Sequence, residues 1–520
     1  MPRAYDARAG ERSLFDALLD ARDRYGAKKP ILEDQERNPL SYTDLVRASF
    51  ALGRKIAGFT ARGEHVGVLL PSSAGVVVTF FGLHAFGRIP TMLNFTAGLR
   101  NLRAAIKLGQ VKTVLTAHRF IEQGKLHDII DAIEETGAKI VYLEEVRAKI
   151  GLSDKLFAAT AGMFPRQFRA ELKPDAPGVI LFTSGSFGAP RGVVLSHANL
   201  VTNVHQIEAH IALDPSWVMF NPLPTFHCFG LTGGVLLPLL TGMKAFEYPS
   251  PLHTKQIPPL IKDCGASILL ATDTFVNQYA RAADPGDLSD LKFIVCGAEK
   301  VREETHNLIA ERFGPIPVLE GYGATEASPV VAVNKPVDNR RGTVGGLLPG
   351  METRVEPVEG IAGGGRLFLR GPNVMSGYLN EAGGVDPLEG GWHDTGDVVE
   401  LDTDHDNWIT IKGRVKRFAK IGGEMVSLTA AEDLAVAVWP NGRHAVVAMP
   451  DKKKGEKLVL FTDRADADVS AMVAHAQSVG APELAVPRKI IKIAEVPVLG
   501  TGKTDYVAIQ RMADTDSRAA

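Results

Sequence analysis

The sequence predicts an α/β protein with a large N-terminal body of sheets covered by helices on both faces, and a small mobile α+β domain at the C-terminal end. Two observations favour this fold. Short apolar runs alternate with helical patterns through residues 30–120 and return at 265–323, an alternation typical of parallel sheets. From about residue 340 short strands are broken by glycines, which fits a barrel-like or antiparallel section.

Individual segments support this interpretation. "HVGVLL" predicts a buried strand that ends at Pro71, and "AGVVVTFFGLHAFG" predicts the helix after it. "HAVVAMPDKKKGEKLVLFTD" predicts a hairpin around a lysine-rich loop. "GRVKR", after the strand "WITI", marks the expected boundary between a domain at 1–413 and a mobile domain at 414–520 that carries a hinge and a catalytic lysine.

Composition excludes several classes. The 520 residues carry 58 Lys plus Arg against 60 Asp plus Glu, so no basic excess suggests nucleic acid. Cys228, Cys264 and Cys296 have no metal-ligand spacing and fit a reducing cytosol. The N-terminus lacks the apolar core of a signal peptide, and two long apolar stretches contain proline and glycine. We therefore expect a cytoplasmic protein, with peripheral contact to the inner face of the membrane left open.

Residues 178–200, "GVILFTSGSFGAPRGVVLSHANL", carry the strongest chemical signal. An apolar strand, Val179 to Phe182, leads into a turn rich in glycine and hydroxyl side chains. Such a turn lets backbone N–H groups approach an anion, and Arg191 adds donors suited to phosphate. A helix is expected from about Asn199. The segment predicts a phosphate-binding loop, with a purely structural turn as the alternative.

A second glycine-rich segment, "PVLGTGKTDY" at 497–506, is similar at its end to a nucleotide-binding P-loop. That motif needs a glycine where this chain has Pro497, and only 17 residues follow Lys503. A P-loop is therefore not expected here, and Lys503 needs another explanation.

Six segments in order resemble the acyl-adenylate-forming (AMP-binding) superfamily, which includes acyl-CoA synthetases and luciferases. The phosphate loop at 178–200 is the first, and the others are "PLPTFHCFG", "GYGATEASPV", "GWHDTGDVVEL", "GRVKRFAKIGGEMVSL" and "PVLGTGKTDY". The resemblance implies that a carboxylate attacks the α-phosphate of ATP, giving acyl-AMP and pyrophosphate. A thiol then takes the acyl group.

The resemblance also assigns roles. Glu326 would hold Mg²⁺, a cation that prefers carboxylate oxygen. Asp397 would bind the ribose with Arg414, and Tyr322 would face the adenine. The remaining ATP-binding residues it implies are Thr183, Ser184, Gly185, Ser186, Gly188, Arg191, Gly297, Ala298, Glu299, Gly321, Gly323 and Thr325.

The implied catalytic residues fall in two regions. His227 would lie near the acyl carboxylate; because amino-acid-activating relatives keep an aspartate in that segment, a histidine favours a plain carboxylic acid. Lys503 would approach the α-phosphate when the small domain closes. Lys416 matches the hinge about which that domain rotates, so that Lys420 and Gly422-Gly423 then face the site for thioester formation. Two residues depart from the family pattern: Arg191 replaces a lysine, and Phe187 stands where a polar residue is more common.

"TDLVRASFALGRKIA", "MLNFTAGLRNLRAAI" and "PELAVPR" resemble more closely the synthetase portion of the bifunctional 2-acylglycerophosphoethanolamine acyltransferase/acyl-acyl-carrier-protein synthetases. This implies transfer of a fatty acid to the phosphopantetheine thiol of acyl carrier protein, using ATP and Mg²⁺. The fused acyltransferase domain of those relatives is not in this sequence, so a separate acyltransferase partner stays open.

Three alternatives remain: a long- or medium-chain fatty acyl-CoA synthetase, a non-catalytic module that binds acyl-adenylate or lipid, and a luciferase-type oxidase. Because carrier proteins are acidic, a basic docking face is expected on the small domain. An ordinary solvated lysine loop is an equally good interpretation of part of it. The candidate docking residues are Arg417, Lys452, Lys453, Lys454, Arg488 and Lys489.

Overall fold

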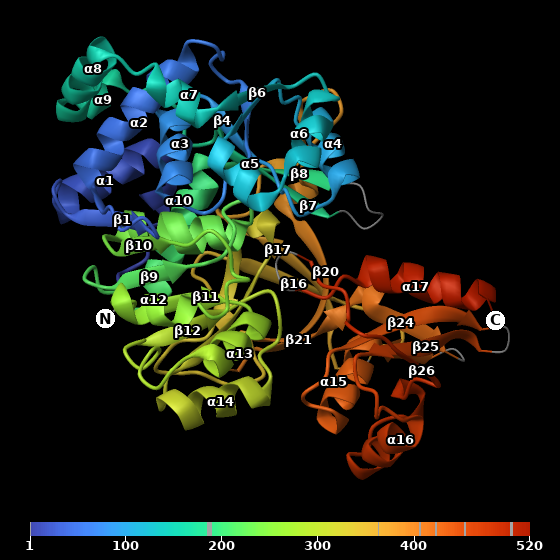
Figure 1. Cartoon of the computed structure of the whole chain (residues 1–520). Helices are drawn as coiled ribbons and strands as arrows, with labels where there is room; N and C mark the ends of the chain where they lie inside the picture. Colours follow the sequence, from blue (N-terminus) through green and yellow to red (C-terminus); the bar gives the residue numbers. More distant parts are fainter. Residues whose placement is uncertain are drawn as a thin grey trace. The chain divides into compact units, whose positions relative to one another are not determined.

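The computed structural model is shown in Figure 1. It describes residues 2–184, 190–361, 363–404, 407–421, 424–451, 454–499 and 503–519. Contacts between Cα atoms divide the chain into two compact units, Met1–Glu352 with Arg370–His393, and Thr353–Leu369 with Asp394–Ala520. The second unit is thus assembled from two pieces of chain and includes strands that precede residue 413.

The first unit contains two mainly parallel sheets with antiparallel strands at their edges. The strand order of one sheet is β15 (Gly346–Leu347), β14 (Val330–Val333), β13 (Val318–Gly323), β12 (Phe293–Cys296), β11 (Ile268–Ala271), β9 (Val218–Asn221), β10 (Lys244–Glu247), β1 (Pro30–Asp34) and β2 (Leu40–Ser41). The order of the other is β19 (Val385–Pro387), β18 (Gly377–Leu379), β8 (Pro190–Ser196), β7 (Pro177–Ser184), β4 (Ile89–Met92), β3 (His65–Val68), β5 (Thr113–Thr116) and β6 (Lys139–Tyr142).

Helices cover both faces of these sheets. The central layer, whose residues share one core with both sheets, comprises α1 (Leu14–Tyr25), α2 (Tyr42–Ala57), α3 (Ala74–Ala85), α10 (His197–His210), the π-helix η2 (Phe229–Leu236) and α11 (Leu237–Thr241). The outer layers are α12 (Ile257–Asp263), α13 (Asp273–Ala282) and α14 (Glu303–Phe313) on the first sheet, and α4 (Leu99–Leu108), α5 (His118–Gly124) and α6 (His127–Glu134) on the second. Other short helices are η1 (Ala7–Gly10), α7 (Leu143–Ala148), α8 (Leu152–Met163), α9 (Pro165–Phe168), η3 (Thr325–Ala327) and η4 (Glu389–Gly391).

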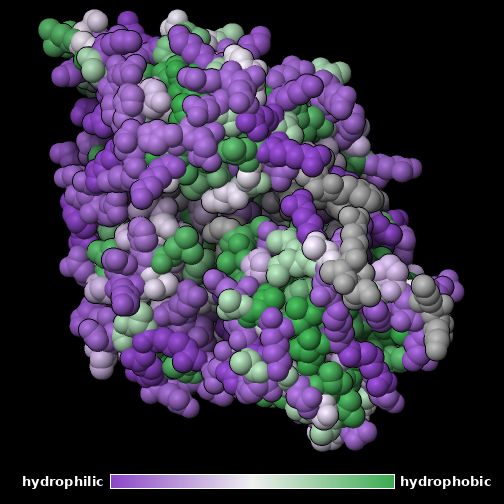
Figure 2. Space-filling view, turned by 45° about the vertical axis from the view of Figure 1, so that its right-hand side comes forward, coloured by the Kyte–Doolittle hydropathy of each residue, from purple (hydrophilic) through white to green (hydrophobic). Residues whose placement is uncertain are grey.

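Uniformly apolar strands follow from this layering. In β11, Ile268 and Leu270 point into the central core while Leu269 and Ala271 point into the outer one. A parallel strand covered on both faces has no polar side, so its sequence is a continuous apolar run rather than an alternating one. The predicted α/β class is therefore confirmed. On the outside of the protein, polar side chains cover most of the face drawn in Figure 2.

The second unit is built around two further sheets. One has the order β16 (Glu352–Pro357), β17 (Gly365–Arg370), β20 (His393–Asp402) and β21 (Trp408–Arg414). The other has the order β23 (Glu424–Ser427), β22 (Phe418–Ile421), β25 (Gly455–Thr462) and β24 (His444–Asp451), with β26 (Lys489–Lys492) beside β25. Helices α15 (Leu428–Val438) and α16 (Val469–Ser478) pack on one face of this sheet, and α17 (Tyr506–Ala519) packs on the other. The remaining short turns are η5 (Val415–Arg417) and η6 (Glu483–Ala485).

Most expected elements occur where the sequence placed them. The strand at 65–70 and the helix at 74–87 correspond to β3 and α3, and the lysine-rich hairpin is β24 with β25. The glycine-broken section after 340 contributes β16, β17, β20 and β21, of which β20 and β21 pair in antiparallel fashion. Within the described residues, no helix is both long enough and apolar enough to cross a membrane.

Two buried histidines behind β7 make the stability of the first unit depend on pH. The His84 Nε2 atom lies 2.7 Å from the carbonyl oxygen of Gly178, and its ring lies 5.1 Å from that of His197. Burial lowers the pKa of His84 to about 4. The pKa of His197 is lowered well below its usual range, mainly by burial and also by the neighbouring His84. Protonation of these two histidines is therefore less favourable in the folded state than in the unfolded chain, whose histidines bind protons below about pH 6.5.

We expect the free energy of unfolding to fall as the pH drops from 6.5 towards 4. His84 alone accounts for a loss of about 2 kcal/mol by pH 5, because the unfolded state binds a proton that the folded state excludes. Urea unfolding at pH 7 and pH 5 measures this. His84→Gln keeps a donor for Gly178 without a titratable charge, so its pH dependence should be shallower; an unchanged slope would contradict the assignment.

Candidate active site

The predicted phosphate loop connects β7 and β8, which pair in antiparallel fashion. Thr183 is paired with Arg191 across the hairpin, so these two residues flank the turn at its base. The hairpin runs directly into α10, whose first turn is closed by a reciprocal capping box between Ser196 and Asn199. The side chain of Ser184 and four residues named in the sequence analysis lie outside the described residues: Gly185, Ser186, Phe187 and Gly188.

A chain of contacts connects this hairpin with the predicted magnesium residue. Strand β18 pairs with β8, placing Tyr378 opposite Val193. The guanidinium of Arg191 lies 5.2 Å from the centre of the Tyr378 ring. The Tyr378 hydroxyl donates a hydrogen bond of 2.8 Å to Oε1 of Glu326. Burial raises the pKa of Tyr378 and the Glu326 carboxylate raises it further, so the phenol keeps its proton at neutral pH.

Tyr378 was not identified from the sequence as a site residue. It is separated from Glu326 by 52 positions and from Arg191 by 187, and only the pairing of β18 with β8 brings the three together. Nothing in the local pattern around "SGYLN" distinguishes it from an ordinary strand tyrosine.

We expect Tyr378→Phe to raise the Mg²⁺ concentration that adenylation requires. The variant keeps the ring beneath Arg191 but removes the donor that orients Glu326, and a hydrogen bond to a charged group contributes about 1.5–3 kcal/mol. Titration of Mg²⁺ in a pyrophosphate-exchange assay should show half-saturation at roughly tenfold higher Mg²⁺. Tyr142→Phe is the control, because Tyr142 belongs to the same unit and lies on β6, at the opposite end of the sheet from β18. An unchanged magnesium requirement would rule out this role.

The predicted adenine segments lie at the carboxyl ends of two neighbouring parallel strands: 297–299 follows β12, and 321–323 are the last residues of β13. Cys296, the last residue of β12, pairs with Glu320 of β13. The segments 297–299 and 321–323 therefore emerge side by side at the carboxyl edge of the sheet, where open α/β sheets bind ligands. They contain the predicted residues Gly297, Ala298, Glu299, Gly321, Tyr322 and Gly323, and Thr325 follows in η3. The Glu299 carboxylate accepts a hydrogen bond of 3.1 Å from the backbone N–H of Thr274.

The predicted acyl segment reaches the same edge. A Cβ atom added to Gly297 would lie 3.0 Å from the ring of Phe229, so the glycine admits this aromatic side chain. His227 is half-buried, and its backbone carbonyl accepts from Leu231 at the start of η2. Burial raises the pKa of the Cys228 thiol to about 12, a hydrogen bond with Thr232 opposes this, and the charge of Glu326 contributes to the rise. This cysteine is therefore no thiolate nucleophile.

Two residues predicted to bind ribose meet in the second unit. Asp397 on β20 pairs with Arg414 on β21, and the Nε atom of Arg414 donates to Oδ1 of Asp397 at 2.8 Å. The Asp397 side chain is 6% exposed and that of Arg414 is 68% exposed. The guanidinium therefore shields one carboxylate oxygen and remains accessible to an anionic ligand itself.

The predicted hinge and both predicted catalytic lysines also belong to the second unit. Lys416 lies in the short turn η5, and Lys420 is the exposed residue of β22 between buried Ala419 and Ile421. Lys503 closes a turn whose arms are bonded to each other: Leu499 N–H donates to its carbonyl at 2.7 Å. This arrangement differs from the strand–loop–helix of a P-loop. Residues 500–502 and Gly422-Gly423 lie outside the described residues.

A buried ionic cluster fixes the chain just beyond Lys503. The Glu432 carboxylate forms an ion pair with Arg417 at 2.7 Å, and it accepts hydrogen bonds from Tyr506 at 3.1 Å and from the backbone N–H of Val446 at 2.7 Å. The Arg417 guanidinium also lies 3.8 Å from the centre of the Tyr506 ring. Burial raises the pKa of Glu432, although Arg417 opposes that shift. With its side chain only 16% exposed, Arg417 does not fit the docking face predicted for it.

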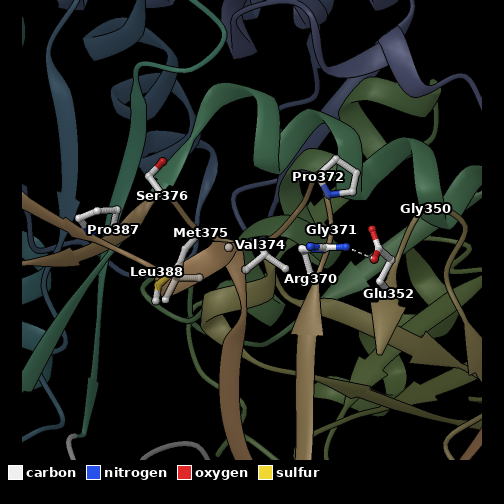
Figure 3. Close-up of a pocket in the computed structure, with 11 residues that line it drawn as sticks. Gly350, Glu352, Arg370, Gly371, Pro372, Val374, Met375, Ser376, Pro387 and Leu388 are labelled. Atoms are coloured by element: carbon white, nitrogen blue, oxygen red, sulfur yellow. Dashed lines mark hydrogen bonds and ion pairs between the residues drawn. The ribbon is translucent and has the colours of Figure 1, made fainter. Parts of the chain in front are cut away.

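A separate open cavity of about 430 Å³ lies in the first unit (Figure 3). Glu352 and Arg370 form an ion pair on one wall, and the backbone N–H of Met375 is bonded to the Glu326 carbonyl at 2.7 Å. Since none of the predicted nucleotide residues lines this cavity, we do not assign the nucleotide to it. Its lining residues are Gly350, Glu352, Arg370, Gly371, Pro372, Val374, Met375, Ser376, Pro387, Leu388 and Gly391.

The residues present fit a magnesium ion held jointly with a nucleotide. Among the described residues no group of three or more His, Cys, Asp or Glu side chains could hold a metal ion. Mg²⁺ in nucleotide sites is commonly bound through one or two carboxylates together with substrate phosphates. Glu326 has one oxygen oriented by Tyr378 and lies near the base of the phosphate-loop hairpin, as such a site requires.

Comparison with known proteins places these features in a family. Residues 19–379 match the model of the AMP-binding enzyme family, a span that contains the phosphate-loop hairpin, the Phe229 segment, Glu326 and Tyr378. Among curated proteins, 4-coumarate–CoA ligase 2 of Oryza sativa subsp. japonica is 28% identical over 464 residues, covering 82% of this chain and 78% of its own. 4-coumarate–CoA ligase 3 of Arabidopsis thaliana is 27% identical, with 85% and 81% covered.

Solved structures share the fold over nearly the whole chain. ATP-bound MatB from Rhodopseudomonas palustris superposes with a TM-score of 0.82 at 23% identity, covering 96% of this chain and 99% of its own. The anthranilate CoA ligase AuaEII, in complex with anthranoyl-AMP, superposes with a TM-score of 0.81 at 20% identity and 97% coverage of both chains. With its family model matched over most of the first unit, the chain belongs to the AMP-binding enzyme family.

Proposed function

We propose that the protein is an ATP-dependent fatty-acid ligase that transfers its acyl group to the phosphopantetheine thiol of an acyl carrier protein. In the first step a carboxylate oxygen attacks the α-phosphorus of ATP, and pyrophosphate leaves. In the second step a thiol attacks the acyl carbonyl, the thiol proton is lost and AMP leaves. Neither step requires an oxidant, so the luciferase-type alternative is not part of this proposal.

The observation that carries this proposal is the contact chain from Arg191 through Tyr378 to Glu326, at the edge of the sheet where β12 and β13 end. It supports a cation and a carboxylate acting on the same polyphosphate, which adenylation requires since its transition state carries dispersed negative charge. Glu326 would hold Mg²⁺ with the phosphate oxygens, and the ion would neutralise their charge. Thr183 and Arg191 would hold the phosphates, and Asp397 with Arg414 the ribose.

The second unit would supply a different lysine for each step. Lys503 would stabilise the charge that develops at the α-phosphate, and Lys420 would face the site after rotation near Lys416. Both lie on chain held by hydrogen bonds within this unit: the Lys503 carbonyl accepts from the Leu499 N–H, and the Lys420 N–H donates to the Glu456 carboxylate at 2.5 Å. Because the two lysines lie on different segments, variants of each can test the two roles independently.

A fatty acid is the proposed substrate because of the segment around His227. No carboxylate follows in η2, whose residues are largely apolar, and π-helical turns are frequent at functional sites. Thr225, Leu231 and Val235 line an apolar cavity of about 10 Å³ with residues of α3 and β4, which is too small for an acyl chain. The apolar composition of η2 supports an uncharged, apolar acyl group over an amino acid.

The acceptor separates the two enzymatic candidates. Resemblance to acyl-carrier-protein synthetases favours carrier protein, whereas the relatives named 4-coumarate–CoA ligases favour coenzyme A. The expected docking face is partly neutralised, because Arg488 pairs with Glu483 at 2.5 Å and Lys489 pairs with Asp516. Lys454 is exposed, and Lys452 and Lys453 lie outside the described residues.

AMP release with acids from short to long, each assayed with holo-carrier protein and with coenzyme A, tests the proposal. Preference for carrier protein, with rates that fall as ionic strength rises, would support the main candidate. Preference for coenzyme A would establish the acyl-CoA synthetase instead. A binding module of another class would show no fatty-acid-dependent pyrophosphate exchange with any acid.

A further inference from the structure

Helix α8 exposes most of its large apolar residues. It packs on α2 through Phe157, whose ring lies 6.2 Å from that of Phe50, and through its buried positions Asp154, Ala158, Ala161 and Gly162. The other large apolar residues point outward: the exposed fractions of Leu152, Leu156 and Met163 are 73%, 61% and 58%. A helix of a water-soluble surface normally buries its largest apolar residues and exposes small or polar ones.

The exposed residues form one continuous stripe. Positions 152, 156, 159 and 163 follow the i, i+4, i+7, i+11 spacing, which places them on one side of a helix. Phe164, 53% exposed, and Phe168, 37% exposed in α9, extend the stripe beyond the helix end. Of the fifteen large apolar residues exposed in the described part of the chain, five lie between 152 and 168. This concentration exceeds the scattered exposure expected of an ordinary surface.

The segment that carries this stripe has an excess of cations. Between residues 147 and 169 the chain has five cations and a single carboxylate, Asp154, although the whole protein has slightly more acids than bases. Asp154 is buried and paired with Lys55 at 2.7 Å. Arg166 and Arg169 are paired with carboxylates of α1. Arg147, Lys149 and Lys155 remain exposed beside the apolar residues.

We propose that the α8–α9 face, defined as Leu152, Leu156, Met163, Phe164 and Phe168 with Lys149 and Lys155, docks on an anionic lipid surface. Apolar side chains beside exposed lysines are the composition by which interfacial helices bind membranes, the apolar groups entering the headgroup region and the cations attracting acidic headgroups. Figure 1 shows α8 and α9 at the outer edge of the first unit, in teal.

Charge decides between a lipid surface and a second copy of the chain. An i, i+4, i+7 stripe also suits helix–helix pairing. Two copies of this face, however, would bring their lysines together, whereas an anionic membrane neutralises them. Docking at a membrane would also place the enzyme where fatty acids partition, which is the part of this inference that rests on the proposed function.

Flotation with vesicles, without any substrate, tests the inference independently of ligase activity. We expect the protein to float with phosphatidylcholine vesicles containing 30% phosphatidylglycerol, and at least tenfold less with phosphatidylcholine alone or in high salt. The double variant Leu156→Glu/Met163→Glu should lose at least tenfold in vesicle affinity. Because both side chains already face solvent, its thermal unfolding should match that of the wild type.

Leu252→Glu, at a residue 62% exposed in the same unit, is the matched control and should float normally. Lys149→Glu/Lys155→Glu should lose the preference for phosphatidylglycerol specifically. Equal flotation of the wild type and Leu156→Glu/Met163→Glu would overturn the inference. Vesicle-independent dimerisation in light scattering, abolished by the same double variant, would overturn it in favour of a second copy.

Discussion

Lys503→Ala should abolish most of the adenylation activity and leave thioester formation from supplied acyl-AMP largely intact. Removing a group that stabilises transition-state charge typically lowers a rate about 10²–10³-fold. Lys503 would act only when the α-phosphate is attacked, so the loss should appear in fatty-acid-dependent pyrophosphate exchange and not in the second half-reaction. Single-turnover assays of each step measure the asymmetry.

Two variants make this result specific. Lys420→Ala, on β22 of the same unit, should show the reverse pattern and slow thioester formation more than adenylation. Lys412→Ala removes an exposed lysine paired with Glu400 on the surface, and such pairs contribute little. It should therefore leave both steps unchanged. Equal damage to both half-reactions by Lys503→Ala would refute its assignment to the first.

Arg417→Ala should destabilise the second unit by about 3 kcal/mol, because removal of one partner leaves a buried carboxylate without its countercharge. Only 12% of the Glu432 side chain is exposed, and its neighbours are a phenol and a backbone N–H. Urea unfolding at pH 7 would measure the change in free energy. The loss of Arg417 would also release the ring contact with Tyr506, which anchors the chain three residues after Lys503.

The pH dependence of this loss has a definite sign. Burial already raises the pKa of Glu432, and the variant should raise it further because Arg417 now opposes that rise. A carboxyl whose folded pKa is raised is favoured in its protonated form, so its contribution to stability falls as the pH rises. Arg417→Ala should therefore be more destabilising at pH 8 than at pH 5. Arg464→Ala, which breaks an exposed pair with Asp466, should have little effect at either pH.

Local patterns predicted the elements well, because strand and helix periodicity and turn chemistry are local properties. The alternation of apolar runs predicted β3, β11, β12 and β13, and the glycine-rich turn after Phe182 is the β7–β8 hairpin. The roles assigned to Thr183, Glu326, Asp397 and Lys503 remain predictions. Lys503→Ala tests the role of that lysine, and Tyr378→Phe tests the role of Glu326 indirectly. The order of the motifs suggests these roles, but it gives no distances between the residues.

Contacts between remote segments could not be predicted. Tyr378 reaches Glu326 because β18 pairs with β8, and this pairing depends on the register of the assembled sheet. Arg417 was expected on an exposed basic face because it is one of the cations of the small domain, yet the partners that bury it are Glu432 and Tyr506. The stripe on α8 would be expected to face a core, and instead α2 contacts the opposite side.

The two-piece composition of the second unit has a consequence for chimeric enzymes. A single crossover near residue 413 would combine the sheet β16-β17-β20-β21 of one parent with the C-terminal segment of another. Those parts are closely fitted: a Cβ added at Gly360 would lie 2.7 Å from Met425, and one at Gly413 would lie 3.4 Å from Phe418. Recombination that exchanges 353–369 together with 394–520 keeps each such interface from one parent, and is the safer design for exchanging this unit between relatives.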